Sequence, residues 1–325
     1  MILSTPARIS PMNHTQQHPE PHDGSPQPAS ARNAARRPAA PSGVDRPTHA
    51  ETRHSVTVGG RTMVWRHFGA GPALVLLHGG HGDWRHWIRN IDALARGHSV
   101  WLPDLPGFGD SDALDGHAHA PDRMERLVDA LVAAIDDLIA PAPTLDLAGF
   151  SFGGLVAAHL AARVPVRRLA LLGPAGHGGA RRQTVPLTDW RALRGDRRKA
   201  ALQQNLAAFM LHDGTCVDDR ATAIYESQCE RTRFRSKAIS QAGGLAPCLD
   251  RLTMPVLLAW GEHDVTAQPQ IIGPQLADGV ATRQWRLIRD AGHWVQYERH
   301  HAIDALLLDW FDVGAAPAPQ PARGA

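Results

Sequence analysis

Short runs of apolar residues alternate with helical patterns along most of this chain. Several runs are continuously apolar, which is typical of strands buried on both faces of a parallel sheet. Such alternation indicates an α/β fold, and it predicts a mostly parallel sheet of about eight strands covered by helices on both sides. The expected strands cover residues 55–58, 62–68, 73–77, 99–102, 144–148, 168–172, 255–260 and 282–288, and the expected helices include residues 121–139, 154–162 and 301–311.

The alternation stops between residues 174 and 252, where the sequence is rich in Arg and helical in composition. An insertion at this point of a sheet enzyme is expected over the carboxyl ends of the strands, where ligands bind. We therefore predict a helical lid at about residues 174–252. The alternative is a peripheral helical excursion that does not contact a substrate.

The two ends of the chain lack apolar periodicity. Residues 1–52 are dense in Pro, Ala, His, Gln and Arg, and residues 314–325 are rich in Ala and Pro. Such segments bury too little apolar surface to offset the entropy lost on ordering. We predict two disordered tails, at residues 1–52 and 314–325, around a domain at residues 53–313.

Composition narrows the classes of function. The 325 residues carry a formal charge of only +2, without a basic stripe, which argues against a nucleic-acid partner. No apolar run is long enough to cross a membrane. The three cysteines have no metal-ligand or redox spacing, and the N-terminus lacks the apolar core of a signal peptide. These features predict a cytoplasmic protein.

The most informative segment is Gly-Phe-Ser-Phe-Gly at residues 149–153. It lies between an expected strand and an expected helix, so Ser151 would occupy a sharp strand-to-helix turn. Glycines at both second neighbours let other segments approach closely. This geometry presents a serine hydroxyl above the sheet, next to the amides of a helix N-terminus. Ser151 is the candidate nucleophile.

A serine hydroxyl needs a base to take its proton and a third group to orient that base. Asp264 follows the expected strand at residues 255–260, and His293 follows the strand at residues 282–288. Both thus lie at the edge of the sheet where Ser151 is expected. We predict a triad of Ser151, Asp264 and His293, and Glu262 is a competing acid closer to its strand.

The oxyanion formed in acyl transfer needs two N–H donors that are already in place. The amide of Phe152, directly after the nucleophile, is one candidate. The loop after the strand at residues 73–77 reads His78-Gly79-Gly80-His81-Gly82, and Gly80 is the candidate for the second. His78 is expected to have a structural rather than a catalytic role.

Together these segments resemble the α/β-hydrolase fold across about residues 55–312. The resemblance rests on the His-Gly-Gly loop, the segment Asp-Leu-Pro-Gly-Phe-Gly-Asp-Ser at residues 104–111, the serine turn, and the loops that end in Asp264 and His293. Because residue 151 is Ser, the aspartate-nucleophile branches, such as dehalogenases and epoxide hydrolases, are excluded.

The segment Gly-His-Trp-Val-Gln-Tyr-Glu at residues 292–298 resembles the meta-cleavage-product hydrolases, as does the loop at residues 78–90. Those enzymes cut a carbon–carbon bond in vinylogous diketones. The chain departs from that branch at Phe150 and at His86, where the branch has Asn. The resemblance makes His86, Phe150 and Trp294 candidate substrate-binding residues. It also implies a carboxylate-binding Arg in the lid, and Arg231, Arg233 and Arg235 are candidates; the alternative is a solvated basic face.

The favoured hypothesis is a serine hydrolase that needs no cofactor and no metal and attacks a carbonyl in a small hydrophobic molecule, most simply a carboxylic ester. The alternative reaction is carbon–carbon hydrolysis of a vinylogous diketone. A rival from another class is a non-catalytic ligand-binding receptor on the same fold. The sequence leaves the oligomeric state open.

Overall fold

The protein is described by a computed structural model that covers residues 47–139, 142, 144–182 and 185–312. Most of the two predicted tails, at residues 1–52 and 314–325, lies outside the described residues. Close to the first described residue, the backbone N–H groups of Thr48 and His49 donate to the carboxylate of Asp92, at 2.8 Å and 3.2 Å. The chain is therefore bound to the domain from this point onward.

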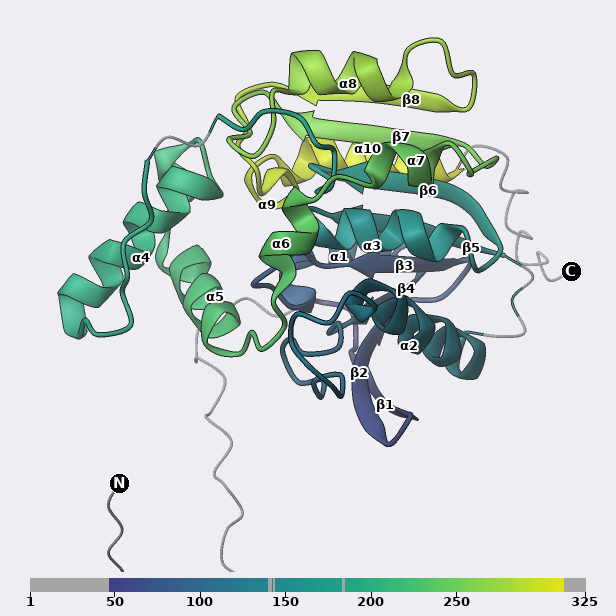
Figure 1. Ribbon diagram of the computed structural model, residues 1–325, viewed down its shortest axis with the longest axis horizontal. Coiled ribbons are helices and arrows are strands. Elements are labelled where there is room, and N and C mark those ends of the chain that lie inside the picture. Colours follow the sequence, from purple (N-terminus) through teal and green to yellow (C-terminus); the bar gives the residue numbers. More distant parts are fainter. Residues whose placement is uncertain (1–46, 140–141, 143, 183–184, 313–325) are drawn as a thin grey trace, which may run out of the picture. The chain divides into compact units, whose positions relative to one another are not determined.

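A mixed, mostly parallel sheet of eight strands runs through the domain (Figure 1). The strand order is β1-β2-β4-β3-β5-β6-β7-β8; β2 is antiparallel to β1 and β4, and all other neighbours are parallel. The predicted fold class and strand number are confirmed. The strands are β1 (Thr52–Val58), β2 (Arg61–Phe68), β3 (Ala73–Leu77), β4 (Ser99–Pro103), β5 (Leu145–Phe150), β6 (Val166–Leu172), β7 (Val256–Gly261) and β8 (Arg283–Ile288).

Both faces of the central strands are apolar and buried. On β6, Leu169 and Leu171 join one core cluster, whereas Ala170 and Leu172 join another on the opposite face. This is why the runs in the sequence are continuous rather than alternating. Helices α2 (Arg123–Leu138), α3 (Phe152–Ala161), α7 (Leu245–Leu249) and α8 (Pro269–Ala277) contribute to the first cluster, and α1 (Ile91–Leu94), α9 (Val295–Glu298) and α10 (His300–Asp312) contribute to the second.

Between β6 and β7 the described residues form helices and contain no strand. We call residues 174–252 the helical insertion. Its elements are α4 (Gly195–Phe209), the 3₁₀ turn η2 (Gly214–Cys216), α5 (Asp219–Glu230), α6 (Ser236–Gln241) and α7. Figure 1 shows α6 beside the ends of the central strands. Leu206 of α4 and Ile224 of α5 are buried in the second core cluster, so the insertion packs on the sheet domain.

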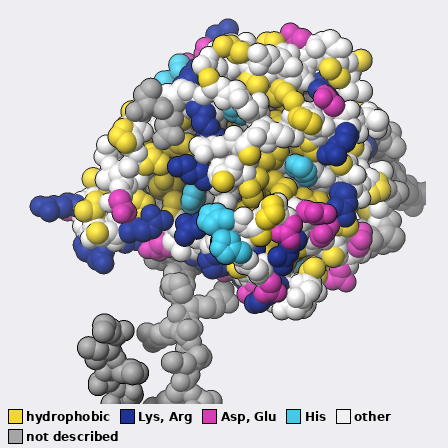
Figure 2. All heavy atoms as spheres, in the orientation of Figure 1, with side chains coloured by type: hydrophobic (Ala, Val, Ile, Leu, Met, Phe, Trp, Pro, Cys, Tyr) yellow, Lys and Arg dark blue, Asp and Glu magenta, His cyan; other side chains and the backbone are white. Residues whose placement is uncertain are grey.

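The helical insertion carries a positive excess. Residues 174–252 hold thirteen Lys and Arg against eight Asp and Glu, although the whole chain has a net charge of only +2. Figure 2 shows these basic side chains over the part of the surface where Figure 1 places α4 and α5. The remainder of the chain must therefore be acidic on balance, so the two parts differ in charge although the total is near zero.

Candidate active site

Ser151 lies on the turn between β5 and α3, as the sequence predicts. Its backbone angles, φ 54° and ψ −117°, fall in a region that residues with side chains rarely adopt. A methyl group on Gly149 would lie 2.4 Å from the Gly153 carbonyl oxygen, and one on Gly153 would lie 2.2 Å from the His78 carbonyl oxygen. Both glycines are thus required, because backbone atoms occupy the space of a side chain.

Three predicted side chains form one continuous hydrogen-bonded chain. His293 Nε2 lies 2.9 Å from Ser151 Oγ, and His293 Nδ1 lies 2.8 Å from Asp264 Oδ2. His293 follows β8 and Asp264 follows β7, so the ends of two neighbouring parallel strands bring base and acid together. The arrangement can pass a proton from the serine hydroxyl to the imidazole while the carboxylate stabilises the resulting charge.

Thr266 holds the Asp264 carboxylate in this orientation. Its backbone N–H and its hydroxyl both donate to Asp264 Oδ1, at 2.7 Å each, which leaves Oδ2 for His293. Burial favours the neutral acid, but the charge of His293 and these hydrogen bonds outweigh it and hold the pKa of Asp264 below its usual value. Sequence reasoning missed Thr266, although an Asp side chain commonly accepts the backbone N–H two residues later.

Glu262, the competing acid, has different partners. Its carboxylate accepts the Asp290 backbone N–H at 3.3 Å and lies 4.0 Å from the Arg289 guanidinium. Asp264 is fully buried, whereas about a quarter of the Glu262 side chain, 26%, is exposed. The acid that contacts His293 is therefore Asp264.

Among the described residues, the backbone amides of Gly80 and Phe152, close to Ser151, have no hydrogen-bond partner, and neither does that of Gly153. The neighbouring Gly79 amide is already engaged, because it donates to His86 Nδ1 at 3.1 Å. Free N–H groups beside a nucleophile are the kind of donors that an oxyanion needs. The geometry is thus consistent with the two donors that the sequence predicts.

His78 connects the β3 loop to the β4 loop. The Leu105 backbone N–H donates to His78 Nε2 at 2.9 Å, and His78 Nδ1 donates to the Gly79 carbonyl oxygen at 2.8 Å. With both ring nitrogens engaged and the side chain fully buried, His78 has the structural position expected for it. Burial also lowers the pKa of His78, which favours the neutral ring.

The three residues predicted to bind substrate form a packed layer behind His293. His86, Phe150 and Trp294 are each exposed by 1% or less. The Phe150 ring lies 4.9 Å from the His293 ring and 5.1 Å from the His86 ring, and Trp294 Nε1 donates to the His86 carbonyl oxygen at 2.9 Å. This packing positions the His293 ring, and contact between these residues and a substrate stays a prediction.

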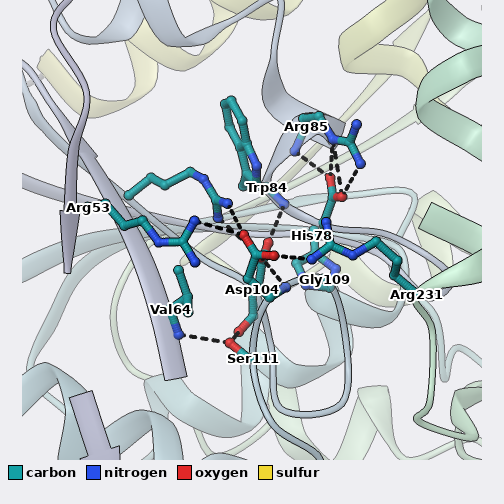
Figure 3. Close-up of polar contacts among 12 residues, drawn as sticks. Arg53, Val64, His78, Trp84, Arg85, Asp104, Gly109, Ser111 and Arg231 are labelled. Carbon is teal, nitrogen blue, oxygen red and sulfur yellow. Dashed lines mark hydrogen bonds and ion pairs between the residues drawn. The ribbon is translucent and has the colours of Figure 1, made fainter. Parts of the chain in front are cut away.

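The Arg residues of the helical insertion differ in their contacts. Arg231 pairs with Asp110, and Arg233 donates from its side chain to the Ser111 carbonyl oxygen, although Arg233 is exposed, as is Arg235. Figure 3 shows Arg231 reaching the buried Asp104 region from the insertion side. Arg231 and Arg233 thus contact the loop after β4, and both the carboxylate-binding Arg and the solvated basic face stay predictions.

The described residues bring together one group with metal-ligand atoms. Glu262, His263 and Asp290 each place such an atom within 4.8 Å of the others. Two of the three are carboxylates on loops near the surface, and Glu262 is already bonded to the Asp290 amide. Exposed acids of this kind often gather without an ion, so the cluster by itself assigns no metal. The three cysteines form no disulfide.

A doubly covered α/β sheet that presents a serine next to a histidine–carboxylate pair defines the class of serine hydrolases. The chain belongs to the α/β-hydrolase fold family, whose model matches residues 72–300. It is 29% identical, over 76% of this chain and 90% of the relative, to a 2-hydroxy-6-oxo-6-phenylhexa-2,4-dienoate hydrolase from Burkholderia cepacia. The predicted fold is confirmed, and so is the predicted resemblance to the meta-cleavage-product hydrolases.

Solved structures of two enzymes with different activities share the fold. A meta-cleavage product hydrolase from Pseudomonas fluorescens IP01 aligns with a TM-score of 0.61 and 22% identity, covering 80% of this chain and 97% of that one. An esterase from Rhodococcus sp. ECU1013 aligns with a TM-score of 0.65 and 21% identity, covering 82% and 99%. Among the described residues, no helix has the length and apolarity needed to cross a bilayer.

Proposed function

We propose that this protein is a serine-triad hydrolase that attacks the carbonyl group of a small hydrophobic substrate, in the simplest case a carboxylic ester. The observation that carries the proposal is the unbroken contact from Ser151 Oγ through His293 to Asp264, at 2.9 Å and 2.8 Å. The helical insertion, beside the ends of the strands, acts as the lid in this proposal.

The reaction follows from the geometry. His293 Nε2 takes the Ser151 proton as Oγ attacks the carbonyl carbon, and the amides of Gly80 and Phe152 donate to the oxyanion. His293 then gives the proton to the departing alcohol, which leaves an acyl group on Ser151. A water molecule, deprotonated by His293, attacks this acyl group, and His293 returns the proton to Ser151 Oγ as the acid is released. Asp264 keeps Nδ1 protonated throughout, so Nε2 is free to accept a proton.

A fluorophosphonate probe and short p-nitrophenyl esters test this proposal. The probe should label the wild type at Ser151, and the esters should be hydrolysed, whereas Ser151→Ala should lose both reactions. Ser240→Ala is a suitable control, because Ser240 belongs to α6 and lies outside the proposed triad. A wild-type protein that is neither labelled nor active would contradict the proposed enzymatic function and support the alternative of a non-catalytic ligand-binding receptor.

A second candidate reaction is hydrolysis of a carbon–carbon bond in a vinylogous diketone. The similarity to a dienoate hydrolase from Burkholderia cepacia supports it. Positive charges near the β3 loop favour an acidic substrate of this kind: desolvation and the charges of Arg191, Arg235 and Lys237 lower the pKa of His81. Arg231 and Arg233 are engaged with the loop after β4, which leaves Arg235 as the candidate of the three for a substrate carboxylate.

The two reactions differ in a simple assay. In the carbon–carbon reaction, His293 would first help to convert the dienol substrate to its keto form, and the yellow colour of the dienone would disappear. Bleaching of such a ring-cleavage product much faster than p-nitrophenyl ester hydrolysis would support the second candidate. Efficient ester hydrolysis with no bleaching would support the first.

A further inference from the structure

Ser236, the first residue of α6, lies directly over the loop that carries Gly80. A methyl group built on Gly80 would be 2.7 Å from Ser236 Oγ, and 3.6 Å from the Cβ atoms of both Ser236 and Phe152. The position that a Cβ atom would take on Gly80 is thus in contact with both the Ser236 hydroxyl and Phe152. Gly80 and Phe152 are the residues whose unpartnered amides are proposed above as the oxyanion donors.

The Ser236 hydroxyl has no hydrogen-bond partner within the part of the chain that the structure describes. Ser236 is only 5% exposed, but its hydroxyl oxygen is not one of the enclosed side-chain atoms that lack a partner, so it is open to a molecule outside the chain. A hydroxyl can donate one hydrogen bond and accept two. A partner outside the chain is therefore expected at the edge of the space where the carbonyl oxygen of a substrate would meet the amides of Gly80 and Phe152.

The preceding residues fix the position of Ser236. The backbone N–H groups of Arg233 and Phe234 donate to the Gly107 carbonyl oxygen, at 2.8 Å and 3.2 Å. The Phe234 ring packs against the rings of Phe108 and Phe152, with centroids 5.6 Å and 5.5 Å apart. Ser236 thus reaches the site from the helical insertion on a segment bound to the sheet domain at several points.

The ion pairs of the same segment explain why it stays docked. Arg231 pairs with Asp110, and Asp110 also binds Arg66 at 2.7 Å, which in turn lies 3.0 Å from the buried Asp104 (Figure 3). Asp104 accepts the Trp84 backbone N–H at 3.0 Å, so the network also includes the loop that follows Gly80. The helical insertion and the loop that carries Gly80 are therefore both bonded to the same network of ion pairs.

We propose that Ser236 donates a third hydrogen bond to the oxyanion, beside those of Gly80 and Phe152, and so is a catalytic residue supplied by the helical insertion. This inference rests on the serine-hydrolase function proposed above. It means that the oxyanion site is complete only while residues 231–236 are docked on the sheet domain. Because the bond is to developing charge, its loss should lower kcat more than it changes KM.

Ser236→Ala tests the inference, with Ser240→Ala, one turn later on α6, as the matched control. On a p-nitrophenyl ester we expect kcat to fall at least about 10-fold in Ser236→Ala while KM stays within about twofold. Affinity for a trifluoromethyl ketone, which forms a charged tetrahedral adduct with Ser151, should fall in parallel. Ser240→Ala should match the wild type in all three quantities.

Ser236→Cys guards against a purely structural effect, because it keeps the side-chain shape but replaces a strong donor by a weak one. A melting temperature close to wild type together with a lowered kcat in this variant would support the inference. Normal kcat in Ser236→Ala, or an equal loss in Ser240→Ala, would overturn it and leave the hydrolase function intact. A wild type that the fluorophosphonate does not label would overturn both.

Discussion

Replacing Asp264 by Asn changes the proton position on His293 while preserving the shape of the site. The Asn carbonyl oxygen can still accept the two hydrogen bonds from Thr266, which places its amide where Oδ2 lies 2.8 Å from His293 Nδ1. An amide N–H and a protonated Nδ1 cannot bond to each other. His293 is therefore expected to move its proton to Nε2, and Nε2 then faces Ser151 as a donor that cannot accept its proton.

The size of this effect follows from the loss of the base. The same change in serine proteases lowers kcat about 10⁴-fold, which corresponds to about 5 kcal/mol of transition-state stabilisation. We expect a similar fall in kcat for p-nitrophenyl butyrate and in the rate of fluorophosphonate labelling. The melting temperature should change little, because the packing and both Thr266 contacts are retained.

Glu262→Gln is the matched control for Asp264→Asn. Glu262 lies two residues before Asp264 and its carboxylate binds the Asp290 amide, at 3.3 Å, rather than His293. Its replacement should leave kcat within about twofold of wild type, since no proton on His293 depends on it. Near-normal activity in Asp264→Asn, or a larger loss in Glu262→Gln, would refute the proposed roles of these two acids.

Three further predictions concern stability. Gly149→Ala should lower the free energy of unfolding, measured in urea, by about 2–3 kcal/mol, because the added methyl group would lie 2.4 Å from the Gly153 carbonyl oxygen. An unchanged urea midpoint would contradict this close approach of the two residues. Arg66→Met should cost about 3–5 kcal/mol by leaving the Asp104 carboxylate, 1% exposed, without its ion-pair partner. Arg61→Met, which removes an exposed ion pair, should shift the urea midpoint far less. Because the folded-state pKa of Asp264 is lowered, its stabilising contribution should be present above the usual Asp pKa of about 3.9 and be lost as pH falls through the lower folded value. Urea unfolding between pH 7 and pH 2 should therefore show a steeper acid decline in wild type than in Asp264→Asn.

The sheet and the three triad positions could be predicted because their signals are local. Ser151 and Asp264 each follow a continuous apolar run, and His293 follows β8, an edge strand in which Trp285 and Leu287 alternate with polar residues. Parallel strands end at the same edge of a sheet, so strand positions alone bring these side chains to one place. The two glycines around Ser151 are likewise visible in the sequence, because only glycine tolerates backbone atoms at 2.2–2.4 Å from a Cβ position.

Ser236 could not be predicted in this way. It lies 85 positions after Ser151, and its place over Gly80 depends on ion pairs and ring contacts of residues 231–234 with a distant loop. No periodic pattern encodes such docking. The burial of His86, Phe150 and Trp294 is a similar case, since sequence resemblance identifies their neighbourhood but not the side of the base on which they pack.

The order of the strands along the chain has a consequence for biosynthesis. Ser151 follows β5 in the middle of the sheet, whereas Asp264 and His293 follow β7 and β8, the last two of the described strands. A growing polypeptide on the ribosome contains the serine turn long before it contains the proposed base or acid. In the proposed mechanism, translation that stops before β8 yields a serine without its base. Covalent labelling of Ser151 would thus report that the polypeptide has been translated beyond β8.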